Sequence, residues 1–286
     1  MIVVFDNTAP KTWWPSSTPS NDPIVHFTDA SAIDQSAVLV LTDRFIGHVV
    51  QLRSNGFKGC IVAFIFEPQS VYPDAYEHAR ANAHQFQHII THDVEFLETL
   101  EPRIGKSYLY GETTLTANER SVMPEKTKHI SLVASDKRWI EGHKMRHEIV
   151  RRLGSKIDAM GRGYKTLVSK AVAHIPYRYS IVVENSRYPR YFTEKLVDCM
   201  LGGCVPIYCG ATDISNVFNM DGILTFNTIE ELENIVDNIA SNEDFAARAE
   251  AIRDNFERAL KFADLQTRLF TMIDEFVKIK QEVNEV

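Results

Sequence analysis

The apolar residues of this chain gather in short runs that are separated by polar segments. Short apolar runs, each followed by a polar residue or a turn, are typical of strands buried in a sheet. The predicted strands of the first half are residues 2–5, 24–27, 37–41, 60–66, 88–90 and 107–110. A helix is predicted over residues 72–87, and the stretch 10–23, rich in Pro, Ser and Thr, is predicted to be a loop.

The second half repeats this alternation after a polar stretch without periodicity at residues 112–128, which predicts an interdomain linker. Its predicted strands are residues 129–134, 156–159, 179–183, 205–209 and 223–226. Its predicted helices are residues 141–152, a helix that begins at Thr193, and residues 228–239, 242–261 and 265–283. Regular alternation of strands and helices favours an α/β fold with two doubly wound, mostly parallel sheets.

One segment, residues 179–210, combines three features of a phosphate site. An apolar strand ends at the polar residues Glu184 and Asn185, and ligands of open α/β sheets bind beyond such strand ends. Thr193 is a good N-cap, and Lys195 then lies in the first turn of the helix. Free backbone N–H groups at a helix start favour an anion, so the segment predicts a bound phosphate. The alternative is an ordinary βαβ unit in which Lys195 faces solvent.

Length and composition narrow the class of protein. The 286 residues suit two α/β domains, and 44% hydrophobic with 24% charged residues is the balance of a soluble globular protein. A net charge of −7 and a pI near 5.8 disfavour a nucleic-acid binder, which would carry a basic surface. Because the chain contains no G-x-G-x-x-G run, a dinucleotide cofactor is also disfavoured.

The four cysteines form no close C-x-x-C pair, which disfavours structural zinc. They are expected to be buried free thiols of a cytoplasmic protein. No signal peptide is visible, and no apolar stretch is long enough to span a bilayer. The sequence therefore predicts a soluble protein of the cytoplasm, with peripheral attachment to a membrane left open.

The motif-rich segment also resembles a known family. In order, it and the residues after it contain Glu184-Asn185-Ser186, Tyr191, Thr193-Glu194-Lys195-Leu196, Val205-Pro206-Ile207, Gly210, Asp213-Ile214 and Phe218-Asn219. This series resembles the signature of the α-1,3/4-fucosyltransferases, glycosyltransferase family 10. The resemblance implies transfer of L-fucose from GDP-β-L-fucose with inversion at the anomeric carbon. It also implies a GT-B-like fold, with two Rossmann-like doubly wound domains facing a cleft.

This resemblance leads to a domain assignment. Residues 1–125 are expected to form the domain that binds the glycan or glycoconjugate acceptor, and residues 126–264 the domain that binds the GDP-sugar. Residues 265–286 are expected to form a C-terminal helix, which is a candidate to cross back to the first domain.

The departing diphosphate requires positive charge. Because no D-x-D motif is present, side chains are expected to supply it, with no essential metal and no cofactor beyond the donor substrate. Lys195 is one candidate. Arg146 is the other, because Ser135-Asp136-Lys137 followed by a helix with this arginine resembles a family motif whose arginine grips the diphosphate. The alternatives are a solvated Arg146 and a metal pair of His143 and His147.

Further donor contacts follow from the resemblance alone. Glu194 is expected to bind ribose hydroxyls, Asn185 to reach phosphate or fucose oxygens, and Tyr191 to pack on the sugar or donate to a phosphate. Guanine is expected near residues 161–164. Glu184, Ser135 and Arg162 are secondary candidates.

An inverting transfer also needs a base to remove the acceptor proton. Glu67 is the first candidate, because it follows an apolar strand, precedes Pro68 and lies in a short run that resembles the first-domain motif of the family. The alternative is a carboxylate in a structural ion pair. Asp93 is the alternative base, and His92 is a candidate to orient the acceptor.

Two other functions remain open. Phosphate-binding residues do not specify the hexose, so the donor could be another GDP-sugar. A non-catalytic protein that binds a sugar nucleotide or a glycan would retain the same second-domain site but form no product.

Overall fold

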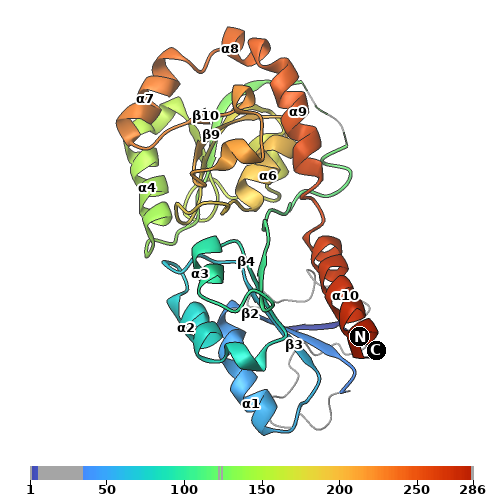
Figure 1. Ribbon diagram of the computed structural model, residues 1–286. Helices are drawn as coiled ribbons and strands as arrows, with labels where there is room; N and C mark the ends of the chain where they lie inside the picture. Colours follow the sequence, from blue (N-terminus) through green and yellow to red (C-terminus); the bar gives the residue numbers. More distant parts are fainter. Residues whose placement is uncertain (1, 6–34, 122, 124, 285–286) are drawn as a thin grey trace. The chain divides into compact units, whose positions relative to one another are not determined.

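The computed structural model describes residues 2–5, 35–121, 123 and 125–284 (Figure 1). The predicted strand 24–27 and the predicted loop 10–23 lie outside the described residues. The chain forms two compact units, one comprising Met1–Leu109 with Leu265–Val286 and the other Tyr110–Asp264.

The first unit contains a five-stranded parallel sheet with the strand order β1-β2-β3-β4-β5. The strands are β1 (Ile2–Phe5), β2 (Val38–Thr42), β3 (Cys60–Ile65), β4 (His88–Thr91) and β5 (Gly105–Ser107). The connecting helices are α1 (Val49–Ser54), α2 (Pro73–Ala81) and α3 (Val94–Glu98). All five residues of β2 are buried, as expected for a strand covered on both faces.

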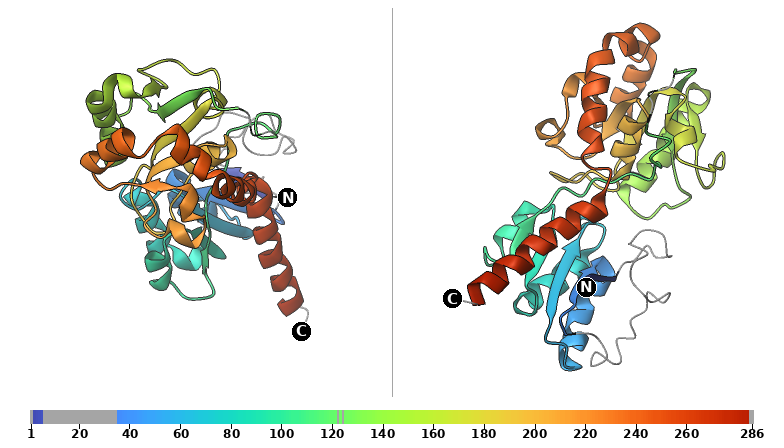
Figure 2. Two further views of the ribbon diagram at one scale, coloured as in Figure 1. Left: turned by 90° about the horizontal axis from the view of Figure 1, so that it is seen from above. Right: turned by 90° about the vertical axis from the view of Figure 1, so that its right-hand side faces the viewer.

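The long helix α10 (Leu265–Asn284) belongs to the first unit, although it follows the second unit in sequence (Figures 1 and 2). Leu265, Leu269 and Ile273 recur at four-residue spacing and are buried. Arg268 donates hydrogen bonds to the carbonyl of Leu109, and its guanidinium lies 5.0 Å from the centre of the Tyr108 ring. These contacts attach the start of α10 to the end of the first unit's main segment.

The second unit contains another five-stranded parallel sheet, with the order β10-β9-β8-β6-β7. Its strands are β6 (Lys128–Val133), β7 (Asp158–Met160), β8 (Tyr177–Val183), β9 (Val205–Cys209) and β10 (Leu224–Thr225). The chain starts at β6 and adds β7 on one side and β8 on the other. The topological switch point therefore lies between β6 and β8, where ligands of open α/β sheets bind at the carboxyl ends.

Helices cover both faces of this sheet, as Figure 1 shows. They are α4 (Glu141–Leu153), α5 (Ala171–His174), α6 (Glu194–Leu201), α7 (Ile229–Asn238), α8 (Asn242–Ala247) and α9 (Ala249–Leu260). Ile149 of α4 and Leu232 of α7 pack in one apolar cluster with Tyr179 and Ile181 of β8. Alternate residues of β8 point to the other face, where Ser180 and its neighbour Ser131 lie under α5.

The boundary between the units falls at residue 110 rather than at the predicted residue 125. The reason is a buried carboxylate, because Asp198 of α6 accepts hydrogen bonds from both hydroxyls and one N–H of Thr113 and Thr114. Leu115 is buried beside them. The first residues of the predicted linker are therefore an integral part of the second unit.

Other differences from the predicted elements have local causes. The last strand of the first unit is Gly105–Ser107 rather than residues 107–110. The predicted helix 242–261 is divided at Arg248, whose side chain turns back to bind Asp244. The short helices α1, α3 and α5 were missed, because one or two turns are too short for a helical period to be recognised.

The start of α4 lies directly against the end of β8. Gly142 donates its N–H to the carbonyl of Asn185 at 3.3 Å. A Cβ at Gly142 would overlap the carbonyl oxygen of Glu184 and would lie 2.9 Å from Cα of Asn185. Only glycine allows the two backbones to approach this closely.

We expect Gly142→Ala to lower the free energy of unfolding by about 3 kcal/mol, because both neighbours of the new methyl group are backbone atoms. Urea unfolding would measure the change. Gly47→Ala is the control, since only the side chain of His78 lies close to that position and can rotate away. Helix propensity alone would make the Gly142→Ala protein more stable than the wild type. Such a gain in stability would contradict the close approach of the α4 backbone to Glu184 and Asn185.

Candidate functional site

The carboxyl end of β8 is joined to the start of α6 by Glu184. This residue is only 2% exposed. Its two carboxylate oxygens accept hydrogen bonds from the N–H of Thr193 at 2.9 Å and from the Thr193 hydroxyl at 2.8 Å. Thr193 is the N-cap of α6, as the sequence predicts, and its oxygen also accepts from the N–H of Lys195. Glu184 therefore fixes the position and direction of the helix start.

The ammonium of Lys195 lies among oxygen atoms at this helix start. Its Nζ donates to the Thr193 hydroxyl at 2.9 Å and lies 3.5 Å from a carboxylate oxygen of both Glu184 and Glu194. A quarter of the side chain is exposed, so an incoming anion can reach it. Lys195 thus occupies the place at the N-terminus of α6 that the sequence predicts.

Glu194 is held by two lysines. Lys170 donates to it at 3.0 Å, and Lys195 lies at 3.5 Å. Burial alone would raise the pKa of Glu194, but the two ammonium groups and the hydrogen bonds lower it well below its usual value. The carboxylate is therefore ionised at neutral pH and accepts hydrogen bonds only.

Arg146 of α4 reaches the same strand end from the other side. It is 5% exposed and donates to the carbonyl of Val183 and to Oδ1 of Asn185, the latter at 3.3 Å. Burial lowers the pKa of the guanidinium, and the charges of Glu184 and Glu194 oppose that shift. The structure thus brings Arg146, Asn185, Glu194 and Lys195 to the switch point of one sheet, and the alternative of a solvated Arg146 is wrong.

Tyr191 is 1% exposed, so its side chain is part of the packing below the site. The loop before it turns at Arg190, whose φ of 63° is left-handed. Asp213 accepts the N–H of Arg190 at 2.6 Å and stabilises this turn. Whether Tyr191 contacts a sugar or a phosphate stays a prediction.

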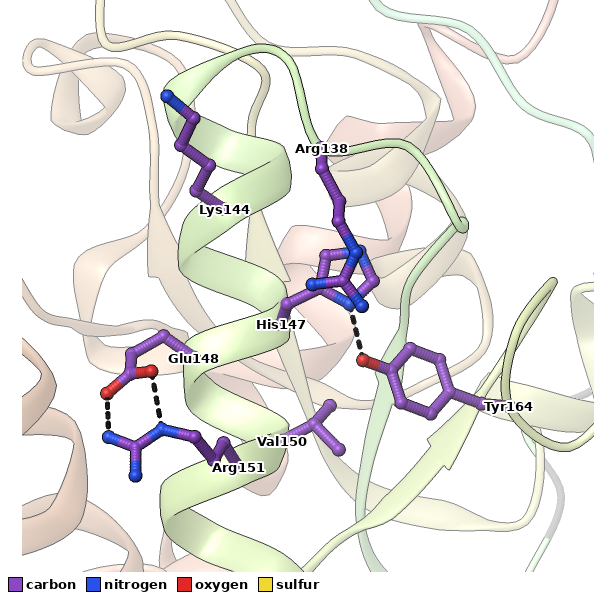
Figure 3. Close-up of a pocket in the computed structure, with 7 residues that line it drawn as sticks. All are labelled: Arg138, Lys144, His147, Glu148, Val150, Arg151 and Tyr164. Carbon is purple, nitrogen blue, oxygen red and sulfur yellow. Dashed lines mark hydrogen bonds and ion pairs between the residues drawn. The ribbon is translucent and has the colours of Figure 1, made fainter.

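The secondary candidates lie at neighbouring positions of the same sheet edge. Ser135 follows β6 and is half-buried, whereas Arg162 follows β7 and is exposed. Beside the turn of Arg162, a cavity of about 430 Å³ lies between α4 and Tyr164 (Figure 3). It is lined by Arg138, Lys144, His147, Glu148, Val150, Arg151 and Tyr164.

His147 contributes to the wall of this cavity with both ring nitrogens in use. Nδ1 lies 2.5 Å from the Tyr164 hydroxyl (Figure 3). Nε2 lies 3.0 Å from the carbonyl of Lys137. A metal needs a free ring nitrogen from each histidine, so the alternative of a His143–His147 metal pair is wrong.

In the first unit, Glu67 follows the carboxyl end of β3 and is half-buried. Its backbone is held on two sides. Asp43, which follows β2 and has a left-handed φ of 31°, accepts the N–H groups of Phe66 and Glu67 at 3.2 and 3.5 Å. The buried hydroxyl of Tyr76 donates to the Glu67 carbonyl at 3.1 Å. Sequence reasoning missed Asp43 and Tyr76, which hold the Glu67 backbone, although Asp43 has the same strand-end position as Glu67.

The two other first-unit candidates follow β4. Asp93 is the N-cap of α3, and its Oδ1 accepts the N–H of Phe96 at 2.9 Å. If Asp93 acted as a general base and took up a proton, it would weaken this capping hydrogen bond at the start of α3. His92 is buried, with 2% of its surface exposed.

A buried carboxyl beside the donor candidates was also missed. Glu112 is 4% exposed and accepts a hydrogen bond from Tyr110 at 2.5 Å. Burial, and next the charge of Glu194, raises the pKa of Glu112 to about 8. Its position in the polar stretch 112–128 carries no periodic signal that could have identified it.

Three residues of the second unit lie close enough together to suggest a metal site. The ligand atoms of His174, Cys199 and Cys204 are all within 4.8 Å of one another and buried. The Cys204 sulfur also lies 2.9 Å from the carbonyl oxygen of His174 and 3.2 Å from that of Tyr177. The ammonium of Lys126 donates to carbonyls in the same region. All four cysteines are free, as expected, and three of them are buried, whereas Cys60 is only half-buried.

The sequence of this chain matches a known protein family. Residues 123–276 match the model of "Glycosyltransferase family 10 (fucosyltransferase) C-term". No curated protein matched the chain. Among the residues that the structure describes, no helix is both long and apolar enough to cross a membrane.

Several solved structures have a similar fold. An α1,3-fucosyltransferase with GDP-fucose has 16% identity and a TM-score of 0.52, over 82% of this chain and 78% of that one. The trehalose-6-phosphate synthase OtsA has 12% identity and a TM-score of 0.62, over 85% and 73%. The Anabaena protein Alr3699/HepE, in complex with UDP and glucose, has 12% identity and a TM-score of 0.57, over 83% and 78%.

These neighbours are GT-B glycosyltransferases, so the predicted GT-B fold is confirmed. The family model covers more than half of the chain and includes Arg146, Glu184 and Lys195. The chain is a glycosyltransferase and belongs to glycosyltransferase family 10, the fucosyltransferases.

Proposed function

We propose that this protein transfers L-fucose from GDP-β-L-fucose to a hydroxyl of a glycan or glycoconjugate, with inversion at the anomeric carbon. The observation that carries the proposal is the convergence of Arg146 and Lys195, from two helices, on the carboxyl end of β8. Family membership supports the choice of sugar, as does the similar fold of a fucosyltransferase that was solved with GDP-fucose.

In this proposal the diphosphate binds between Arg146 and Lys195. Two N–H groups of the Arg146 guanidinium donate to oxygens of Val183 and Asn185, and its remaining N–H groups donate to phosphate oxygens. Lys195 and the start of α6 supply the second positive region. Glu194, which is ionised and accepts hydrogen bonds, binds the ribose hydroxyls, and Asn185 reaches phosphate or fucose oxygens. Because these cations neutralise the leaving group, no metal is assigned a role.

The guanine is assigned to the region of residues 161–164. The aromatic ring of Tyr164 and the arginines of the neighbouring cavity support this assignment, because purines stack on such groups. The four free cysteines support an assignment to the cytoplasm, where thiols stay reduced.

Glu67 is assigned the role of general base for the acceptor hydroxyl. Its strand-end position and its backbone, held by Asp43 and Tyr76, support the assignment, because a base must keep a fixed geometry in the transition state. The inverting pathway follows from such a base. It removes the acceptor proton while the diphosphate leaves from the opposite side of the sugar.

The donor can be tested by thermal unfolding with GDP-fucose, GDP-mannose, GDP, UDP-galactose and UDP. A ligand at one hundred times its Kd adds about 2.7 kcal/mol to stability, which gives a clear rise in Tm. We expect GDP and GDP-fucose to raise the Tm and the UDP compounds to leave it unchanged. A larger rise with GDP-mannose would indicate another GDP-sugar donor, and a rise with UDP alone would contradict the proposed site.

Lys195→Ala should weaken GDP binding by about ten- to a hundredfold, because it removes a charged partner of the diphosphate. Calorimetric titration with GDP would measure this change. Lys156→Ala, at an exposed lysine paired with Asp237, is the control and should bind GDP as the wild type does. Equal GDP affinity in the Lys195→Ala and Lys156→Ala proteins would remove Lys195 from the phosphate site.

Glu67→Gln should retain the wild-type affinity for GDP-fucose but lose turnover by roughly 10²- to 10⁴-fold, because the amide cannot accept the acceptor proton. Product formation under saturating donor would measure turnover, with Glu77→Gln on the exposed face of α2 as the control. Wild-type turnover in Glu67→Gln would assign the base elsewhere. If the wild type binds GDP-fucose but forms no product with a broad acceptor panel, the protein is a sugar-nucleotide binder.

A further inference from the structure

His143 is a buried imidazole in the first turn of α4, one helical turn before Arg146. It is 6% exposed, and its Nδ1 is buried without a hydrogen-bond partner among the described residues. The ring of Trp139 meets it edge to face, with centroids 5.1 Å apart. Because buried polar atoms of native proteins are almost always paired, an unpartnered imidazole nitrogen at a candidate binding site points to a ligand.

The charges that shift the pKa of His143 most are all basic. Its pKa is lowered to about 4, first by burial and then by the positive charges of Arg146, Lys137 and Lys195, with a smaller effect of His147. These cations come from α4, from the loop after β6 and from α6. The carboxylates of Glu184 and Glu194 act on Arg146 from its other side. The imidazole is therefore neutral at pH 7 as long as no anion lies among these cations.

The N-terminus of α4 adds a partial positive charge to the surroundings of His143. Ile140 is the N-cap of this 13-residue helix and provides no side-chain cap to the first N–H groups. The N–H of Gly142 donates to the carbonyl of Asn185, so the donors that this helix start offers an anion are the other N–H groups of its first turn. The unpartnered His143 nitrogen, the uncapped helix start and the three surrounding cations thus describe one anion site.

We propose that His143 takes up a proton from solvent as the nucleotide sugar binds and donates a charged hydrogen bond to its diphosphate. This inference rests on the proposed function, because it takes the bound anion to be the donor diphosphate. The two negative charges offset the repulsion from Arg146, Lys137 and Lys195, so the protonated imidazole becomes the favoured form.

The sign of the pH dependence follows from the proton count. Because the complex holds one proton more than the free protein, binding is favoured by low pH. The Kd for the donor should increase by up to about tenfold per pH unit, from pH about 4 up to the pH at which bound His143 itself titrates. Above that pH the Kd should become constant.

Calorimetric titration with GDP-fucose at pH 6, in buffers of different ionisation enthalpy, measures the protons taken up. GDP-fucose is the suitable probe because both of its phosphates are esterified, so the ligand itself does not titrate near pH 6. We expect the wild type to take up a substantial fraction of one proton. His143→Gln should abolish this uptake and weaken binding at pH 6 by about ten- to a hundredfold.

His129→Gln is the matched control, since His129 is exposed at the opposite end of β6. It should leave the proton uptake unchanged. If His143→Gln does not fold, an NMR titration of the assigned His143 imidazole in the wild type, with and without GDP-fucose, gives the same answer.

The possible outcomes are distinct. Binding of GDP-fucose without proton uptake, or with uptake that persists in His143→Gln, would overturn the inference and leave the proposed function intact. No binding of GDP-fucose by the wild type would contradict the proposed function itself.

Discussion

The candidate site depends on the hydrogen bonds that the buried carboxylate of Glu184 accepts from Thr193. This carboxylate accepts two hydrogen bonds from Thr193 and lies 3.5 Å from the ammonium of Lys195. A buried carboxylate is tolerated only when it is paired and hydrogen-bonded, so β8, the start of α6 and Lys195 constrain one another. The glycine at position 210 contributes, because a side chain there would collide with Glu184 and with the Tyr208 hydroxyl. A ligand at this strand end therefore meets a helix start whose position is set by Glu184.

Sequence reasoning worked best where one local segment carries several constraints. The strand end at Glu184, the N-cap Thr193 and the first-turn Lys195 lie within twelve residues, and strand and cap propensities fix their relation. Arg146 was predicted from the family resemblance alone. Its contact with the carbonyl of Val183 could not be predicted from local patterns, because the two residues lie far apart in sequence. The two doubly wound sheets followed from the alternation of apolar runs and helical segments, which does not depend on any single boundary, whereas the GT-B fold was implied by the family resemblance.

The residues that sequence reasoning missed act through contacts between distant segments. Asp43 holds the backbone of Glu67 from a neighbouring strand, and Asp198 holds Thr113 from α6. A polar residue that follows a strand or faces the interior of a short helix looks the same in sequence whether it is buried or solvated. The domain boundary was misplaced for this reason, since the hydrogen bonds that attach the polar stretch to α6 leave no periodic pattern.

The charged side chains of the candidate site are paired with one another within the protein. Lys170 and Lys195 share Glu194, and Lys195 also lies beside Glu184. A diphosphate that attracts Lys195 would leave Glu194 with Lys170 as its main partner, and its free lone pairs could then accept hydrogen bonds from ribose hydroxyls. Glu184 stays satisfied by Thr193 throughout. On the proposed function, the same exchange of partners that binds the phosphates thus prepares Glu194 for the ribose, while Arg146 keeps its contact with Val183 as the fixed point of the site.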